Sequence, residues 1–288
     1  MSCWKEPAPA KVNLALDILR RRPDGYHDLY MVMQSVSLSD AVTVEETPGG
    51  FVLDTGDGFT PPPGRSMEQR TVEAFFAAIG RPAPGLRVTL EKRIPAYAGL
   101  GGGSSDVAAL LRVLRKAYCP ALSAAELARI GLSIGSDVPF CVYGGTALAQ
   151  GRGEILTPLP PLSGAYFVLC KPPYDIPTPQ LFARADATTW TRRPDIDGMA
   201  AAVRRGDTEG VAARLCNVFE DVLPPEYGEV FDVKRRMTAL GARNAVMSGS
   251  GPTVCGLFAD ADTARAAADT LRAEYPATFY ATPAPPVE

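Results

Sequence analysis

The sequence predicts an α+β fold with two domains. Segments that alternate apolar and polar residues, as β-strands do, interleave along the whole chain with segments of helical periodicity. The chain has 288 residues, which suits one large domain or two of about 150 residues. The segment LTPLPPLSG at 156–164 is the best candidate for a boundary, because its prolines and glycine separate two folded-looking stretches. We therefore expect domains at 1–158 and 159–288.

The first half of the chain is expected to contain two strands and two helices. Residues 12–19 and 86–92 alternate in hydrophobicity, which indicates half-buried strands. Residues 104–118 place apolar side chains on one helical face, and the basic side chains, Arg112 among them, take another. A further helix is expected after Ser123, because a glutamate three residues later completes a capping box.

The second half is expected to continue the same interleaving. Strand-like runs occur at 165–170, 244–248 and 253–258. A helix is predicted at 260–274, with Asp260 as its N-cap. Strands and helices alternate on both sides of the expected boundary, and this pattern alone does not choose a topology.

Composition and charge favour a globular enzyme that acts on small molecules. Hydrophobic residues make up 46% of the chain and charged residues 21%, which excludes a disordered or collagen-like protein. The 29 basic and 32 acidic residues form no long run of one sign, so neither a nucleic-acid surface nor a membrane-adsorbing face is expected. The N-terminus lacks an unbroken apolar stretch, and we expect a cytoplasmic protein, monomeric or weakly dimeric.

Cysteine and histidine usage argues against a metal centre. The six cysteines are scattered without a C-x-x-C pair, so we expect reduced, mostly buried thiols and no zinc. His27 is the sole histidine, which excludes histidine-rich metal sites and leaves one possible Ser-His-Asp or Cys-His arrangement. No dedicated metal site is predicted.

The strongest local signal is the glycine-rich segment PAYAGLGGGSSD at 95–106. Glycines let a backbone approach a ligand closely, and free N–H groups at the start of the following helix favour phosphate. It is not a Walker A loop, because no Lys-Ser/Thr pair follows the glycines, and Ser104 stands where a dinucleotide fingerprint has its third glycine. The alternative interpretation is a tight strand-to-helix turn.

A second glycine segment, SGSGPT at 248–253, lies between two strand-like runs. Its successive small residues could form a nest of N–H groups for an anion, and the alternative is a plain hairpin turn. Two such loops suggest a polyphosphate held between domains.

Single polar residues supply the remaining candidates. Lys11 would be solvated at a strand edge or would reach into a cleft. Asp137, in GSDVPF, is either a turn or capping residue or a carboxylate displayed at a cleft. Tyr26 and His27 follow an Asp-Gly turn and could stack on and hydrogen-bond to a heterocycle.

Taken together, these segments resemble the GHMP kinases. In chain order they read PAPAKVNLALDI, PDGYHDL, IPAYAGLGGGSSDVAALL, GSDVPF, GGTALAQGRGE, PTPQLF and NAVMSGSGPTVCGLF. Their order and spacing match over roughly residues 7–260, and AKVNL, DGYH and GSDVPF resemble in particular the members that act on cytidine-diphosphate-linked methylerythritol. The resemblance implies an N-terminal domain like domain 2 of ribosomal protein S5 and a ferredoxin-like C-terminal domain.

The resemblance also implies a reaction, the ATP-dependent phosphorylation of the 2-hydroxyl of that substrate in non-mevalonate isoprenoid biosynthesis. Asp137 matches the catalytic aspartate and Lys11 the lysine that holds it, and a lysine within about 4 Å favours the ionised carboxylate. Mg²⁺ is expected to bind mainly through ATP. The residues implied to bind ATP are Pro95, Ala96, Tyr97, Ala98, Gly99, Leu100, Gly101, Gly102, Gly103, Ser104 and Ser105.

A cytidine pocket is implied in the same way, with Tyr26 and Phe182 stacking on the base and His27 bonding its edge. The residues implied to bind substrate are Asn13, Tyr26, His27, Thr178, Phe182, Ser248, Gly249, Ser250 and Gly251. The chain departs from the family in having Arg70-Thr71 where relatives carry Asn-Leu near the nucleotide base, and Ala96-Tyr97 where Met-Gly is common.

Two alternatives stay open at this point. Another GHMP kinase acting on a small alcohol such as mevalonate or homoserine would need no base-stacking pair. A catalytically silent, nucleotide-sensing member of the family would need neither Lys11 nor Asp137.

Overall fold

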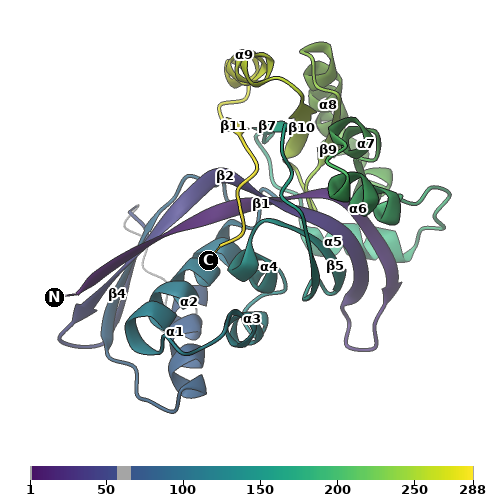
Figure 1. Ribbon diagram of the computed structural model, residues 1–288. Helices are drawn as coiled ribbons and strands as arrows, with labels where there is room; N and C mark the ends of the chain where they lie inside the picture. The colour runs from purple at the N-terminus through teal and green to yellow at the C-terminus, as the bar shows by residue number, and fades with distance from the viewer. Residues whose placement is uncertain (1, 57–65, 288) are drawn as a thin grey trace.

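The computed structural model describes residues 2–56 and 66–287, which form two α/β units, each built on its own sheet (Figure 1). In the described residues the first sheet has the order β3-β4-β2-β1-β8, with β5 paired to β2 and β6 to β5, and the second has the order β11-β7-β10-β9. The strands of the first sheet are β1 (Cys3–Arg21), β2 (His27–Thr47), β3 (Phe51–Asp54), β4 (Gly85–Glu91), β5 (Thr146–Gly151), β6 (Ile155–Leu159) and β8 (Cys216–Asn217). Those of the second are β7 (Tyr166–Cys170), β9 (Asn244–Met247), β10 (Val254–Phe258) and β11 (Thr278–Ala281).

Helices cover these sheets, and the predicted α+β class is confirmed. In the first unit they are α1 (Met67–Ala78), α2 (Gly102–Tyr118), α3 (Ala124–Leu132) and α4 (Val138–Tyr143). In the second they are α5 (Thr178–Asp186), α6 (Ile196–Arg204), α7 (Thr208–Ala213), α8 (Glu229–Ala239) and α9 (Ala261–Arg272), with the 3-10 turns η1 (Val218–Val222) and η2 (Pro225–Tyr227). Among the described residues, no helix is long and apolar enough to cross a membrane.

The first strand is much longer than the predicted 12–19. β1 pairs antiparallel with β2 from its first residue, although it contains Pro7 and Pro9. Prolines are tolerated there because β8 pairs with the other edge of β1 only at Ala15 and Leu16, so their missing N–H groups leave no ladder bond unmade. The strand therefore carries Lys11 in its interior and not at its start.

α2 packs its apolar face onto β1 and β2, as its periodicity predicts, but one residue of its expected polar face is buried. Arg112 is 2% exposed, and its guanidinium donates to the carbonyls of Pro7 at 2.8 Å and Cys141 at 2.9 Å. This basic side chain is buried because carbonyl partners on β1 and α4 compensate for its loss of water.

Helix starts follow the sequence signals closely. The capping box of Ser123 and Glu126 is present at the start of α3. Asp260 caps α9, its side chain accepting the Thr263 N–H at 2.7 Å. Both predictions are confirmed, because they depend only on hydrogen bonds between neighbours in sequence.

The expected linker at 156–164 is wrong in its first half. Ile155–Leu159 forms β6, in which Pro158 lies opposite Ala147 of β5. The proline is tolerated because β6 pairs only with β5 among the described strands. The division into 1–158 and 159–288 stays a prediction. The C-terminal tail also returns to the first unit, with bridges from Val36 to Pro283 and from Gly144 to Pro286 (Figure 1).

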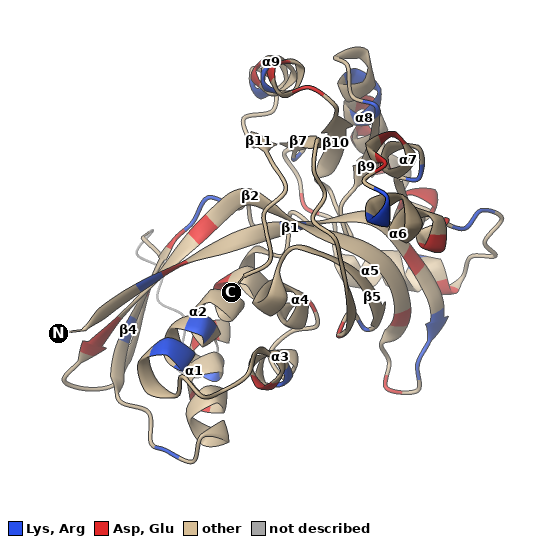
Figure 2. Cartoon of the chain, viewed as in Figure 1, with Lys and Arg blue, Asp and Glu red and all other residues tan. Residues whose placement is uncertain are grey.

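Charged groups are interspersed on the surface, and some pair inside the fold. At the tip of the β1–β2 hairpin, basic and acidic segments lie side by side (Figure 2), and Arg22 pairs there with Asp24 and Asp28. At the edge of the core, the partly exposed Lys92 places its ammonium between two buried carboxylates, Asp40 and Asp106. Burial raises the pKa of Asp106 to about 7, and the nearby Lys92 opposes that rise.

We expect this buried carboxyl to make stability depend on pH. A raised pKa means that folded Asp106 keeps a proton which the unfolded chain has lost, so the free energy of unfolding falls as pH rises from about 4 to about 7. Asp106→Asn, which cannot ionise, is expected to gain stability relative to the parent as pH rises from 5 to 8. Urea unfolding of both proteins at pH 5 and pH 8 measures the difference in their free energies of unfolding. The expectation is contradicted if this difference is the same at the two pH values.

Candidate active site

A cavity of about 740 Å³ lies where the two units meet. β1, the β1–β2 hairpin, both glycine loops and α5 all contribute residues to its wall. The predicted residues that line it are Lys11, Asn13, Tyr26, His27, Gly99, Gly101, Ser104, Asp137, Thr178, Phe182, Gly249 and Ser250. Segments far apart in the sequence are thus brought together in one place.

A lysine–aspartate pair lies in this cavity. Lys11 Nζ is 3.3 Å from Asp137 Oδ2, and it donates to Asn13 Oδ1 at 2.8 Å. Residues two apart on a strand point to the same face, and pairing irregularities between Pro9 and Lys11 and between Asn13 and Ala15 bend β1 locally. Lys11 is 4% exposed, so it is not a solvated edge lysine.

Asp137 immediately precedes α4, yet it does not serve as a cap. Its side chain makes no capping hydrogen bond, and 33% of it is exposed. The carboxylate therefore faces Lys11 and the cavity, where it can accept a hydrogen bond from a ligand hydroxyl.

The first glycine loop passes under the cavity and opens α2. Gly99 and Gly101 have φ of 73° and 69°, values that glycine adopts without strain. Gly101 lies at the N-cap of α2 with no side chain over the first N–H groups, so these groups are open to an anion at Ser104. The carbonyl of Leu100 accepts the Lys11 N–H at 2.9 Å, which fixes the loop to β1.

Several predicted loop residues do not reach this cavity with their side chains. Ala98, Leu100 and Ser105 are buried, and Ser105 donates to the carbonyl of Pro9. Tyr97 is 79% exposed and lines a second, smaller pocket of about 530 Å³ together with Gly251. Those outside the wall of the main cavity are Pro95, Ala96, Tyr97, Ala98, Leu100, Gly102, Gly103, Ser105, Ser248 and Gly251.

The second glycine loop, residues 248–253, joins β9 to β10 in an antiparallel hairpin. The hairpin interpretation therefore describes its backbone, and Gly249 and Ser250 also line the cavity. Ser248 Oγ accepts the Asn13 N–H at 3.2 Å and donates to the Gly99 carbonyl at 2.9 Å. This serine bridges β1 and the two glycine loops.

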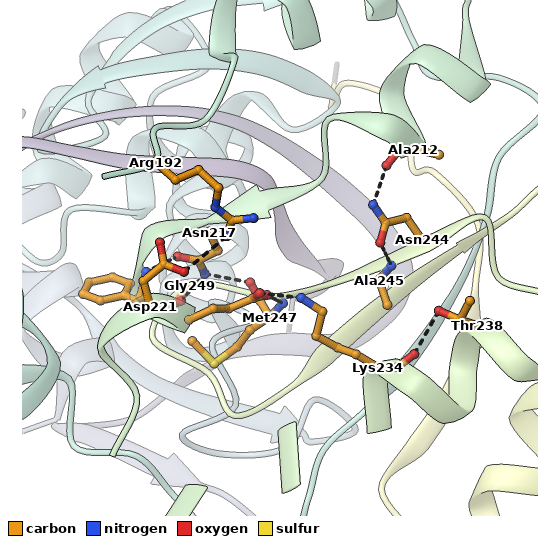
Figure 3. Close-up of polar contacts among 12 residues, drawn as sticks. Arg192, Ala212, Asn217, Asp221, Lys234, Thr238, Asn244, Ala245, Met247 and Gly249 are labelled. Carbon is orange, nitrogen blue, oxygen red and sulfur yellow. Dashed lines mark hydrogen bonds and ion pairs between the residues drawn. The ribbon is translucent and has the colours of Figure 1, made fainter. Parts of the chain in front are cut away.

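A residue that sequence reasoning missed holds this loop from below. Asn217 is 0% exposed, and its Nδ2 donates to the carbonyls of Met247 at 2.7 Å and Gly249 at 2.8 Å (Figure 3). Its Oδ1 accepts the Phe219 N–H at 3.0 Å. No local pattern around residue 217 signals this role, because both carbonyls lie about thirty residues away in sequence.

Removing this anchor is expected to destabilise the protein. Asn217→Ala would leave buried backbone groups without partners, which costs about 2–3 kcal/mol in the free energy of unfolding. Asn244→Ala is the matched control, since Asn244 is half-buried and its side chain bonds, among the described residues, only the Ala212 carbonyl and the Ala245 N–H (Figure 3). Urea unfolding should show the larger loss for Asn217→Ala, and equal losses would contradict the anchoring role.

Aromatic rings and a histidine–carboxylate hydrogen bond form the far end of the cavity. His27 stacks on Phe182 with ring centroids 4.4 Å apart, and His27 Nε2 lies 2.8 Å from Asp186 Oδ1. Neither contact is with a serine or cysteine, so they do not form the Ser-His-Asp or Cys-His arrangement. Thr178 bonds Ser250 at 2.6 Å and connects α5 to the second loop. Sequence reasoning missed Asp186, whose partner is 159 residues away.

One of the two departures from the family pattern, Arg70-Thr71, lies on α1, whereas Ala96-Tyr97 lies in the first glycine loop. Arg70 is exposed, and the hydroxyl of Thr71 is occupied by the Met67 carbonyl at 2.7 Å. In the described part of the chain, no group of three or more His, Cys, Asp or Glu residues could hold a metal ion.

Comparison with known proteins identifies the family. The family model described as "GHMP kinases N terminal domain" matches residues 67–145, and "GHMP kinases C terminal" matches 199–277. A 4-diphosphocytidyl-2-C-methyl-D-erythritol kinase from Moorella thermoacetica is 43% identical over 276 residues, 95% of this chain and 96% of that protein. One of the same name from Geobacillus thermodenitrificans is 41% identical over 87% of each chain.

A solved structure agrees with these relatives. The crystal structure of a 4-(cytidine 5'-diphospho)-2C-methyl-D-erythritol kinase superimposes with a TM-score of 0.81 at 35% identity, covering 96% of this chain and 98% of that one. Both the sequence relatives and the fold thus extend over nearly the whole chain, including the cavity and the elements around it. The chain belongs to the GHMP kinases and, within them, to the family of 4-diphosphocytidyl-2-C-methyl-D-erythritol kinases.

Proposed function

We propose that the chain transfers a phosphoryl group from ATP to the 2-hydroxyl of 4-(cytidine 5'-diphospho)-2-C-methyl-D-erythritol, giving the 2-phosphate and ADP. The observation that carries this proposal is the pairing of Lys11 with Asp137 at 3.3 Å inside the cavity bounded by both glycine loops. The names of the relatives supply the substrate. A silent, nucleotide-sensing member of the family would have no need of this pair.

In this proposal Asp137 orients the substrate hydroxyl and accepts its proton as the phosphoryl group transfers. The ammonium of Lys11, held by Asn13 at 2.8 Å, holds the carboxylate in position and stabilises negative charge on the reacting oxygens. Phosphoryl transfer through a loose transition state depends on alignment and charge neutralisation more than on a strong base. The pair supplies both.

The phosphates of ATP would lie at the N-terminus of α2. The open N–H groups after Gly101, the hydroxyl of Ser104 and the backbone of Gly249 provide the donors. Mg²⁺ would be held mainly by the nucleotide, with Ser104 offering an oxygen of the protein, and it would neutralise phosphate charge. The residues of the chain hold the phosphates in line with the hydroxyl.

The aromatic end of the cavity would take the cytosine. Tyr26 is 50% exposed and offers a ring face, and His27 and Phe182 form a wall fixed by Asp186. Because Asp186 occupies Nε2 of His27, the ring atom available to a base is Nδ1. A fitted polar edge of this kind discriminates strongly against bases that lack the matching groups.

An assay of ADP release separates the candidate functions. Purified protein is incubated with ATP and Mg²⁺ and with the cytidine-diphosphate substrate, mevalonate, homoserine or no acceptor. Turnover with the first acceptor alone supports the proposal. Turnover with mevalonate or homoserine would contradict the proposed substrate. ATP binding without turnover of any acceptor would favour a nucleotide sensor.

A further inference from the structure

The turn between β5 and β6 carries an arginine into the cavity wall. Gly151 and Gly153 have φ of 69° and 113°, so the turn at GRGE is built on backbone that favours glycine. The N–H of Arg152 donates to the carboxylate of Glu154. Arg152 itself lines the cavity, yet the proposed function assigns it no role.

The guanidinium of Arg152 is placed but not neutralised. It lies 3.6 Å from the ring centroid of Tyr26, and Nη2 donates to Ser136 Oγ at 3.2 Å. Its Nε is buried without a hydrogen-bond partner in the structure described. A buried donor on a charged group costs free energy when it is left unsatisfied, so this atom points to a ligand.

The other cations of the cavity wall already have carboxylate partners. Lys11 pairs with Asp137 at 3.3 Å, and Arg21 with Asp186 at 3.8 Å. Arg152 makes no ion pair within 4.0 Å in the described part of the chain. Among the cations of the cavity wall, Arg152 is therefore the one whose charge can pair with an anionic substrate.

The position of Arg152 connects the two ends of the proposed substrate site. Tyr26 belongs to the base end, whereas Ser136 adjoins Asp137 at the hydroxyl end. A Cβ on Gly153 would lie 3.6 Å from the Ser136 carbonyl oxygen and 3.9 Å from Asp137 Oδ1. If a molecule places its base on Tyr26 and its hydroxyl at Asp137, the part of the molecule that links the two passes Arg152.

We infer that Arg152 binds the diphosphate of the substrate and selects nucleoside-diphosphate-linked alcohols over uncharged nucleosides. The inference rests on the proposed function for its choice of substrate. A planar guanidinium matches phosphate oxygens with paired donors, and stacking on Tyr26 fixes its orientation in advance. The cation is thus oriented beside the base, where it can bind the phosphates.

The test compares CDP and cytidine as competing ligands for the parent, Arg152→Gln and Arg152→Lys. The parent should bind CDP more tightly than cytidine, and Arg152→Gln should lower that ratio by about 10- to 100-fold with cytidine affinity nearly unchanged. Arg152→Lys should restore part of the ratio. With the full substrate, Arg152→Gln should raise KM more than it lowers kcat. Arg20→Gln is the matched control, an exposed arginine of the same region paired with Asp28, and it should behave as the parent.

Each result decides the inference. If Arg152→Gln weakens cytidine and CDP equally, the arginine only supports Tyr26 and the inference is overturned. An unchanged ratio overturns it as well. Failure of the proposed function is seen separately, because the parent would then bind CDP in an Arg152-dependent way without turning over the full substrate. A melting temperature within a few degrees of the parent shows that the variant is folded.

Discussion

Replacing Asp137 by alanine is expected to lower kcat for phosphoryl transfer by about 10³-fold while the protein stays folded. A positioned acid or base contributes about 10²- to 10⁴-fold, and here the same carboxylate also orients the hydroxyl. Stability should change little, because Asp137 caps no helix and its side chain is 33% exposed. Steady-state ADP release and thermal unfolding measure the two effects on the same preparation.

The control for this prediction is Asp221→Ala. Asp221 has a similar exposed fraction, 37%, and pairs with Arg192 at 3.2 Å (Figure 3), but it does not line the cavity. The two variants remove the same charge from carboxylates of similar exposure, and only Asp137 lines the cavity, so only its loss should slow turnover. Comparable activity in both variants would show that the pair of Lys11 and Asp137 is structural.

The features that could be predicted from the sequence are those whose cause is local. The capping box at Ser123, the cap at Asp260 and the glycine loop before α2 all follow from residues within a few positions of one another. The site residues were predicted from the order of the motifs along the chain. Most of them line the cavity. Local chemistry and resemblance together therefore indicated both the class of fold and the centre of the site.

The features that were missed depend on contacts between distant segments. Asn217 bonds carbonyls about thirty residues away, and Asp186 bonds His27 across 159 residues. Arg112 has a basic side chain in a polar helical pattern. Only the fold shows that carbonyl groups of β1 and α4 accept its hydrogen bonds. In a sequence, the prolines of β1 and β6 argue against a strand. In the fold they are tolerated because each lies where one edge of its strand is not paired.

Replacing Gly99 by alanine is expected to reduce kcat/KM by at least about 100-fold. Its φ of 73° costs about 1–2 kcal/mol for a residue with a Cβ. In addition, the new Cβ would lie 2.1 Å from the Ser248 carbonyl oxygen, so the two glycine loops must move apart. Displacing a catalytic constellation by about 1 Å can cost about 10²-fold in rate.

Gly80→Ala separates the effect of backbone strain from the effect of the close approach between the two glycine loops. Gly80 has a similar φ, 65°, but a Cβ there meets nothing within 4 Å. It should therefore lose about 1–2 kcal/mol in urea unfolding and keep full activity. If Gly99→Ala lost no more activity than Gly80→Ala, close approach of the loops would not be needed for catalysis. Strain alone would then account for the glycine, and the bridge that Ser248 makes between Asn13 and Gly99 would serve only the fold.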